Sequence, residues 1–148
     1  GCYALGGADT LNAIDLAVCM GAAFSLGHGM SHACEKSNQP KRVVSSMGDS
    51  TCFHTGINSL IEVAYNGSPT INVILDNRIT GMTGHQENPG TGYNIKGDTT
   101  SFIDIEAVVR ALGLKNIRIV NPLDLKAMNE ALDWAYAITD EPSVIITK

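Results

Sequence analysis

Two apolar runs, each ending in a polar tip, constrain this chain more than any other feature of its sequence. The runs cover residues 42–47 and 71–75, and their β-branched residues are typical of buried strands. Asp49 follows the first run, Asn77 follows the second, and one helix-length segment lies between them. A strand–helix–strand unit makes the two strands parallel and places both tips at the carboxyl edge of one sheet, where open α/β sheets bind ligands. We therefore expect Asp49 and Asn77 to face each other across a crevice.

The rest of the chain continues the alternation of helices and strands. Helical spacing or composition predicts helices at about 19–30, 57–64, 102–112 with Asp104 as N-cap, and 123–138, and apolar runs predict strands at 117–120 and 143–147. This order predicts an α/β fold with a doubly wound, mostly parallel sheet. Residues 1–9 are rich in Gly and are expected to form a loop. Residues 78–100 are polar and longer than an ordinary connection, which predicts a loop that covers a ligand.

Length and composition predict one globular domain over residues 1–148. The chain has 148 residues, of which 44% are hydrophobic and 17% charged, enough for a substantial core. Its start at Gly1 leads us to expect a segment of a longer polypeptide. The formal net charge of −5, without any basic run, argues against nucleic-acid or anionic membrane surfaces. No apolar run approaches the roughly 20 residues that span a bilayer, so no membrane segment is predicted.

The cysteine and histidine spacings predict no soft-metal site. The four cysteines, at positions 2, 19, 34 and 52, contain no CxxC pair, so we expect neither a disulfide framework, nor a zinc site, nor an iron–sulfur cluster. Free thiols of this kind suit a reducing cytoplasm. His28 and His32 are four residues apart on a predicted helix but have no third ligand nearby, so we interpret them as structural.

The polar tips instead carry the oxygen donors that magnesium prefers. Asp49 offers a carboxylate, Asn77 an amide oxygen, and Ile79 a backbone carbonyl two residues beyond, which leaves room for phosphate oxygens and water. Gly48 permits a bend, and the amides of Ser50 and Thr51 open a helix whose positive end attracts a diphosphate. Either tip alone is a commonplace turn. Together, each after a buried strand, they predict a metal–diphosphate site.

These residues resemble a known cofactor motif. Gly48-Asp49-Ser50, followed after residues 51–76 by Asn77, is similar to the thiamine diphosphate motif GDG…NN, with Ser50 in place of the last Gly and Asp76 in place of the first Asn. Residues 48–56 and 75–86, with 1–6 and 15–21, closely resemble the alpha subunit of indolepyruvate ferredoxin oxidoreductases, a family of ferredoxin-dependent 2-oxoacid oxidoreductases. The resemblance covers essentially the whole chain. It implies a thiamine diphosphate-binding fold of the diphosphate-binding type.

The same resemblance implies a role for individual residues. It assigns magnesium to Asp49, Asn77 and the Ile79 carbonyl, and the diphosphate to Gly48, Ser50 and Thr51. Further cofactor contacts fall into three groups: Gly1 and Cys2 beside the ring end, Met20 and Gly21 near the pyrimidine, and Thr83, Gly84, His85 and Gln86, which close over the cofactor. No catalytic residue is assigned. His54 and His85 are candidates because an imidazole can move protons near neutral pH, although His54 could equally pack or cap a helix.

The activity implied by the resemblance is oxidative decarboxylation of an aryl pyruvate, such as indolepyruvate, to an acyl-CoA. Electrons would leave through iron–sulfur clusters to ferredoxin, and coenzyme A and the clusters would be bound elsewhere in the whole enzyme. The implied partners are a pyrimidine-binding domain that supplies a glutamate, a ferredoxin-type cluster domain, and a second subunit, in a cytoplasmic oligomer. The isolated segment is therefore expected to be inactive.

Two other functions remain open at this point. A non-oxidative thiamine enzyme, of the 2-oxoacid decarboxylase or acetolactate synthase type, would use a similar site, although Ser50, Asp76 and the Thr83–Gln86 stretch disfavour it. Alternatively, the segment is a cofactor-binding or assembly module without turnover of its own.

Overall fold

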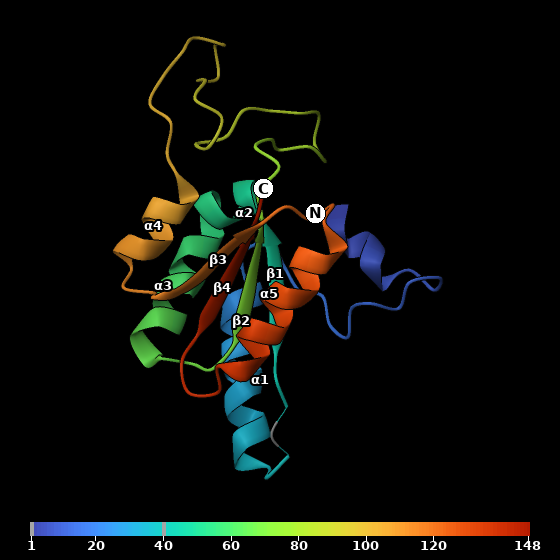
Figure 1. Cartoon of the computed structure of the whole chain (residues 1–148). Helices are drawn as coiled ribbons and strands as arrows, with labels where there is room; N and C mark the ends of the chain where they lie inside the picture. The colour runs from blue at the N-terminus through green and yellow to red at the C-terminus, as the bar shows by residue number, and fades with distance from the viewer. Residues whose placement is uncertain (1, 40) are drawn as a thin grey trace.

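The computed structural model describes residues 2–39 and 41–148 as a parallel α/β structure. Four strands, β1 (Val44–Gly48), β2 (Ile71–Leu75), β3 (Asn116–Val120) and β4 (Ser143–Thr147), form one sheet in the order β1-β2-β4-β3, and all three pairings are parallel. The carboxyl ends of the strands and the C-terminus lie at one end of the molecule (Figure 1). The predicted fold class is therefore confirmed, with strand boundaries within two residues of those expected.

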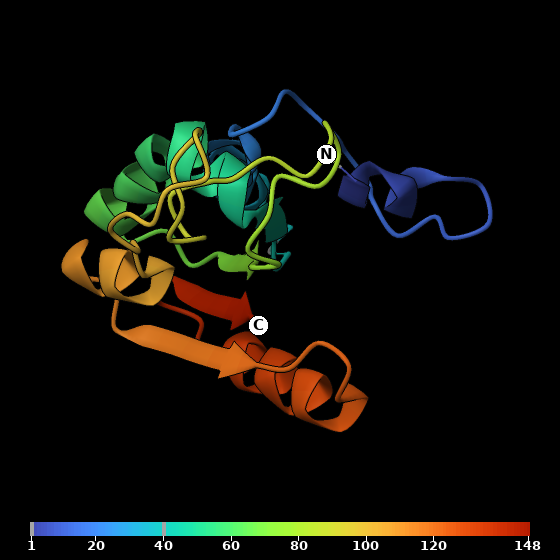
Figure 2. The same ribbon diagram turned by 90° about the horizontal axis from the view of Figure 1, so that it is seen from above.

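Helices cover both faces of this sheet, as a doubly wound fold requires. One face packs against α1 (Ala23–Lys36), α3 (Ile57–Asn66) and α4 (Ile105–Ala111), through a core that includes Phe24, Leu60 and Val109. The other face packs against α5 (Leu125–Ala137), through Ala131 and Ala135. Figure 2 shows α5 alone on its side of the sheet, beneath β3 and β4. Because α5 does not reach the far edge, β1 is left partly open on that face.

Strand β1 is an edge strand whose residues alternate in exposure. Ser45 and Met47 are buried toward α1 and α3, whereas Val44 and Ser46 are exposed on the opposite face. A period of two is expected for a strand with one covered face. The open edge and face of β1 form one wall of the cleft described below.

The helical run after β1 begins at the strand end itself. Gly48 is extended (φ −75°, ψ 159°), and α2 (Asp49–Thr51) continues through the π-helical turn η2 (Cys52–Gly56) into α3. The spacing of apolar residues predicts only the α3 part of this run. The π-helical turn has no signature in the sequence, although such turns often occur at functional sites.

Two expectations for the N-terminal region are wrong. The helix expected over residues 19–30 begins only at Ala23, because Gly21 has a left-handed φ of +91° and its carbonyl oxygen accepts a hydrogen bond from Ser59 Oγ at 2.7 Å. The loop expected over residues 1–9 contains a 3-10 helix, η1 (Cys2–Gly7), whose end is marked by a hydrogen bond from Ala8 N to Leu5 O at 3.0 Å. Figure 2 shows η1 projecting from the body of the molecule.

The remaining helix starts depend on side-chain caps. Asp104 caps α4 by accepting a hydrogen bond from Glu106 N at 3.3 Å, as predicted, although α4 starts at Ile105 rather than at residue 102. Asp124 caps α5 in the same way, through Ala127 N at 3.0 Å, and this cap was not predicted.

Between β2 and α4 the chain forms no helix or strand, only the isolated bridges Thr80–Gln86 and Tyr93–Thr99, so the long loop is confirmed. None of the helices in the described part of the chain is long and apolar enough to cross a bilayer.

Candidate functional site

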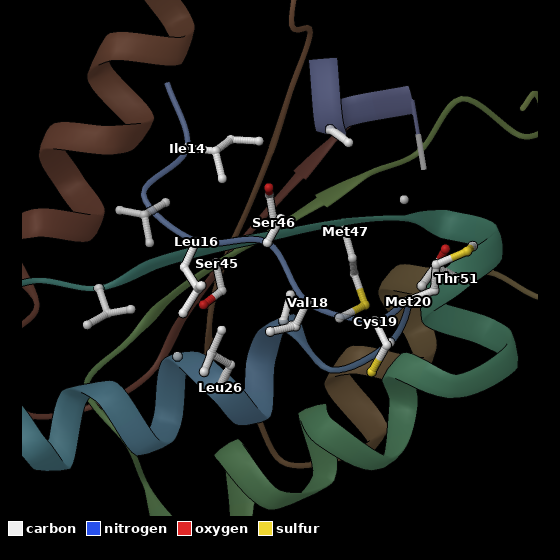
Figure 3. Close-up of a pocket in the computed structure, with 18 of the residues that line it drawn as sticks. Ile14, Leu16, Val18, Cys19, Met20, Leu26, Ser45, Ser46, Met47 and Thr51 are labelled. Carbon is white, nitrogen blue, oxygen red and sulfur yellow. The ribbon is translucent and has the colours of Figure 1, made fainter. Parts of the chain in front are cut away.

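A cleft of about 560 Å³ lies beside β1, between the strand and the segment that precedes α1 (Figure 3). Its volume falls within the range of about 300–1,000 Å³ that is usual for ligand sites. Figure 3 shows Ile14, Leu16 and Val18 passing alongside Ser45 and Ser46. Eight residues that the sequence analysis assigned to the cofactor or metal line this cleft: Met20, Gly21, Gly48, Asp49, Ser50, Thr51, Asn77 and Ile79. The fold therefore brings the two polar tips together.

The other predicted residues lie elsewhere or outside the described part. His54 is exposed on η2 and does not line the cleft. Thr83, Gly84, His85 and Gln86 are exposed at the tip of a hairpin closed by the Thr80–Gln86 bridge, and they do not line the cleft either. Gly1 and the side chain of Cys2 lie outside the described part of the structure. The roles of these residues stay predictions.

Asp49 is the most deeply buried acidic group of the site, with 2% of its surface exposed. Its Oδ2 accepts a hydrogen bond from Asn88 Nδ2 at 3.0 Å, and the described residues supply no other hydrogen bond to the carboxylate. Burying a carboxylate beside a neutral partner is costly unless a cation or further donors are added. The carboxylate is therefore suited to bind a cation.

The charges around Asp49 also favour a bound cation. Burial, followed by the charge of Asp49, raises the pKa of Cys52 to about 12. The same two causes, in the same order, raise the pKa of Asp76, against the opposing effect of the Arg78 backbone N–H that donates to Asp76 Oδ1 at 3.2 Å. A divalent cation at this point would offset the negative potential that both groups experience.

The second tip also offers oxygen donors of the kind that bind a hard cation. Asn77 Oδ1 accepts a hydrogen bond from Ile79 N at 3.2 Å, which folds residues 77–79 into a turn and leaves the amide oxygen a second lone pair. The Asp49 carboxylate, the Asn77 amide oxygen and the Ile79 carbonyl are all oxygen donors of the kind that a hard divalent cation prefers, and the three residues line the same cleft. The described residues contain no group of three or more His, Cys, Asp or Glu side chains that could hold a metal ion, so a cation here would depend on the single carboxylate of Asp49 and on neutral oxygens.

The histidine pair on α1 is occupied by protein contacts. His28 and His32 meet edge to face with ring centroids 4.6 Å apart, His28 Nδ1 hydrogen-bonds Ser68 Oγ, and His32 lies 3.7 Å from Glu35. These contacts agree with the structural interpretation of the pair.

The raised pKa of Cys52 predicts an unreactive thiol. At pH 8 a pKa of about 12 leaves only about one thiolate in ten thousand, and Cys52 is also buried, whereas Cys19 is exposed. In the folded protein we expect iodoacetamide at pH 8 to modify Cys19 and to leave Cys52 unmodified, as read by peptide mass spectrometry. In urea both should react. Equal labelling of the two cysteines in the folded protein would contradict the described burial of Cys52.

Comparison with known proteins identifies the family to which the chain belongs. The family described as "Thiamine pyrophosphate enzyme, C-terminal TPP binding domain" matches residues 1–147, which is nearly the whole chain. The chain belongs to this family. Thiamine pyrophosphate is another name for thiamine diphosphate, so the matched domain type is the one implied by Gly48-Asp49-Ser50 and Asn77.

Curated relatives of this TPP-binding domain carry one name. "Indolepyruvate oxidoreductase subunit IorA" of Archaeoglobus fulgidus is 39% identical over 89% of this chain and 20% of that protein. The proteins of the same name from Thermococcus kodakarensis and Methanothermobacter thermautotrophicus are each 38% identical over the whole chain and over 24% and 23% of their own lengths. The chain thus spans about a fifth to a quarter of the length of these relatives. The predicted resemblance is confirmed.

A solved structure contains the same fold. The 2-oxoglutarate:ferredoxin oxidoreductase of Magnetococcus marinus superposes with a TM-score of 0.75 over 86% of this chain and 44% of that chain, at 18% identity. At this identity the likeness shows the fold alone.

Two residues of the TPP-binding domain that contact the site escaped the sequence analysis. Asn88 binds Asp49, and Thr80 Oγ1 lies 2.7 Å from Ser50 Oγ. Both belong to the long loop, where polar residues are usual and no periodicity identifies the ones that fold back. The Asn88-Pro89-Gly90 stretch is typical of a turn, so its sequence gave no sign of a buried contact.

Proposed function

We propose that this domain binds thiamine diphosphate through a magnesium ion held by Asp49, Asn77 and the Ile79 carbonyl, within a 2-oxoacid:ferredoxin oxidoreductase that converts an aryl pyruvate such as indolepyruvate to an acyl-CoA. The observation that carries the proposal is the buried Asp49 carboxylate at the start of a helix, lining a cleft with Asn77 and Ile79. The name of the relatives supports indolepyruvate as the substrate.

In this proposal, the residues of this domain bind and orient the metal and the cofactor. Asp49 and Asn77 supply oxygen ligands from two neighbouring strand ends, so the position of the metal is set by the sheet. Gly48 is extended before the helix, and the free amides of the first helical turn present positive dipole ends to a diphosphate. When bound, thiamine diphosphate would supply the nucleophilic carbon for the 2-oxo group and would store the electron pair that departing carbon dioxide leaves behind. Ser45, Ser46 and the apolar residues opposite them form the sides of the cleft.

The site is proposed to be completed by other parts of the enzyme. Five large apolar residues between positions 5 and 20 are 47–70% exposed, which is unusual for a surface that faces only water: Leu5, Leu11, Leu16, Val18 and Met20. Leu16, Val18 and Met20 line the cleft, and Leu5 and Leu11 precede them in the same segment, so we assign this surface to contact with a pyrimidine-binding domain that carries the acid–base glutamate. A ferredoxin-type cluster domain, a second subunit, coenzyme A and iron–sulfur clusters complete the proposed cytoplasmic oligomer, of which this chain is one domain of a longer polypeptide.

Steady-state assays of the assembled enzyme test the reaction. With indolepyruvate, coenzyme A and thiamine diphosphate, we expect two electrons to reach ferredoxin for each carbon dioxide released. The kcat/KM should be at least tenfold above that for pyruvate, a difference of about 1.4 kcal/mol in transition-state binding. Carbon dioxide release without ferredoxin reduction would instead indicate a non-oxidative decarboxylase. Equal kcat/KM values for the two substrates would overturn the aryl specificity.

A further inference from the structure

Asn88 lies where the long loop between β2 and α4 returns to the site. Its side chain is 5% exposed, in a loop whose neighbouring residues 82–87 are all exposed. The amide Nδ2 donates to Asp49 Oδ2 at 3.0 Å, across 39 positions of sequence. The loop thus has one buried polar side chain at this point, and that side chain contacts the carboxylate assigned to the metal.

The two ends of the Asn88 amide are fixed by partners of opposite kind. Gly90 N can only donate, and it lies 2.8 Å from Asn88 Oδ1, whereas an ionised Asp49 carboxylate can only accept. Only one orientation of the amide satisfies both partners. Aspartate at this position would lose the hydrogen bond that Asn88 donates to Asp49. A residue without an acceptor would lose the hydrogen bond from Gly90 N.

The backbone around Asn88 is anchored on the helical turn that carries Asp49. A Cβ at Gly90 would lie 3.0 Å from Phe53 Cε2, so the loop packs closely on the side chain four residues after Asp49. Thr91 N and Oγ1 donate to Asn88 O at 3.0 and 2.9 Å, and Ile103 N donates to Pro89 O at 3.0 Å. These contacts position the backbone of residues 88–90 independently of the bond between Asn88 and Asp49.

We propose that Asn88 is a positioning residue for Asp49. Its amide holds Oδ2 and sets the rotation of the carboxylate, which leaves Oδ1 to bind the divalent cation. This inference rests on the proposed function, because it assumes that Asp49 binds magnesium. Groups that orient metal-ligating carboxylates typically change metal affinity about 10- to 100-fold when they are removed.

The test measures metal binding directly in the natural protein. Mn²⁺, a spectroscopic substitute for magnesium, is titrated in the presence of thiamine diphosphate and followed by electron paramagnetic resonance. We expect Asn88→Ala to weaken Mn²⁺ binding about 10- to 100-fold. Thr91→Val is the matched control, because it removes a hydrogen bond of the same turn without touching Asp49, and it should leave Mn²⁺ affinity unchanged. If Asn88→Ala does not fold, Asn88→Leu fills the same space without a donor and should give the same loss.

A double variant separates positioning from a general structural role. In the Asp49→Ala background, Asn88→Ala should cause no further loss of Mn²⁺ affinity, because its effect passes through the missing carboxylate. If Asp49→Ala weakens Mn²⁺ binding but Asn88→Ala leaves it unchanged or makes it tighter, the proposed role of Asn88 is wrong and the metal site stands. Equal weakening by Thr91→Val, or an additive loss in the double variant, would also overturn it. If Asp49→Ala itself leaves Mn²⁺ binding unchanged, the proposed metal site is wrong and this inference falls with it.

Discussion

Replacing Asp49 by alanine is expected to weaken the magnesium-dependent binding of thiamine diphosphate by about 100-fold or more. Removal of a group that only orients a metal ligand already costs up to about that much. Asp49 is itself the buried carboxylate of the site, and its neighbours Asn77 and Ile79 offer neutral oxygens only. The loss should be read by calorimetry, as the dissociation constant of the cofactor at saturating magnesium.

The fold should survive this substitution. Asp49 makes one side-chain hydrogen bond within the described residues, to Asn88, and the helix it begins has no side-chain cap to lose. Asp133→Ala removes an exposed carboxylate of α5 that does not line the cleft, and serves as the matched control with unchanged cofactor affinity. Retained affinity in Asp49→Ala would show that the metal is held elsewhere.

The second large effect is expected on stability, at Gly21. An alanine there would have to adopt φ +91°, and its Cβ would lie 2.1 Å from Thr55 Oγ1 and 3.1 Å from the backbone carbon of Thr55. Backbone strain and overpacking each cost about 1–3 kcal/mol, so Gly21→Ala should lower the free energy of unfolding by about 2–6 kcal/mol. Urea unfolding followed by circular dichroism measures the difference.

A second glycine provides the control for Gly21. Gly29 lies within α1, and a Cβ there would meet no atom within 4 Å. Gly29→Ala should therefore raise the free energy of unfolding by up to about 1 kcal/mol, the helix propensity difference between the two residues. Adding Thr55→Ala to Gly21→Ala should restore stability only in part, because the backbone contact and the positive φ remain. A change below about 0.5 kcal/mol in Gly21→Ala would contradict the described backbone.

Short-range patterns were enough to predict the sheet and the meeting of the two tips. Apolar runs rich in β-branched residues locate β1 and β2, and the parallel crossover then requires Asp49 and Asn77 to share an edge. Asp104 was identifiable as a cap because its role is local. In each case the decisive interactions lie within one element or between neighbouring strands.

The features that escaped prediction depend on contacts distant in sequence. Gly21 interrupts an otherwise helical composition because Ser59 binds its carbonyl and Thr55 occupies the space beside it, neither of which is visible near position 21. Asn88 is likewise defined by Asp49, 39 positions away. Composition alone could not distinguish a polar loop residue that folds into the site from one exposed to water.

The central claim is that a metal, held by Asp49 and Asn77, attaches the cofactor to this domain. Calorimetric titration of thiamine diphosphate into the natural protein, once with magnesium and once with a chelator, tests it most directly. We predict binding in magnesium and a loss of at least about 100-fold in affinity when the metal is removed, since the diphosphate and Asp49 are both anionic and repel each other without it. Equal affinity with and without magnesium would contradict the claim.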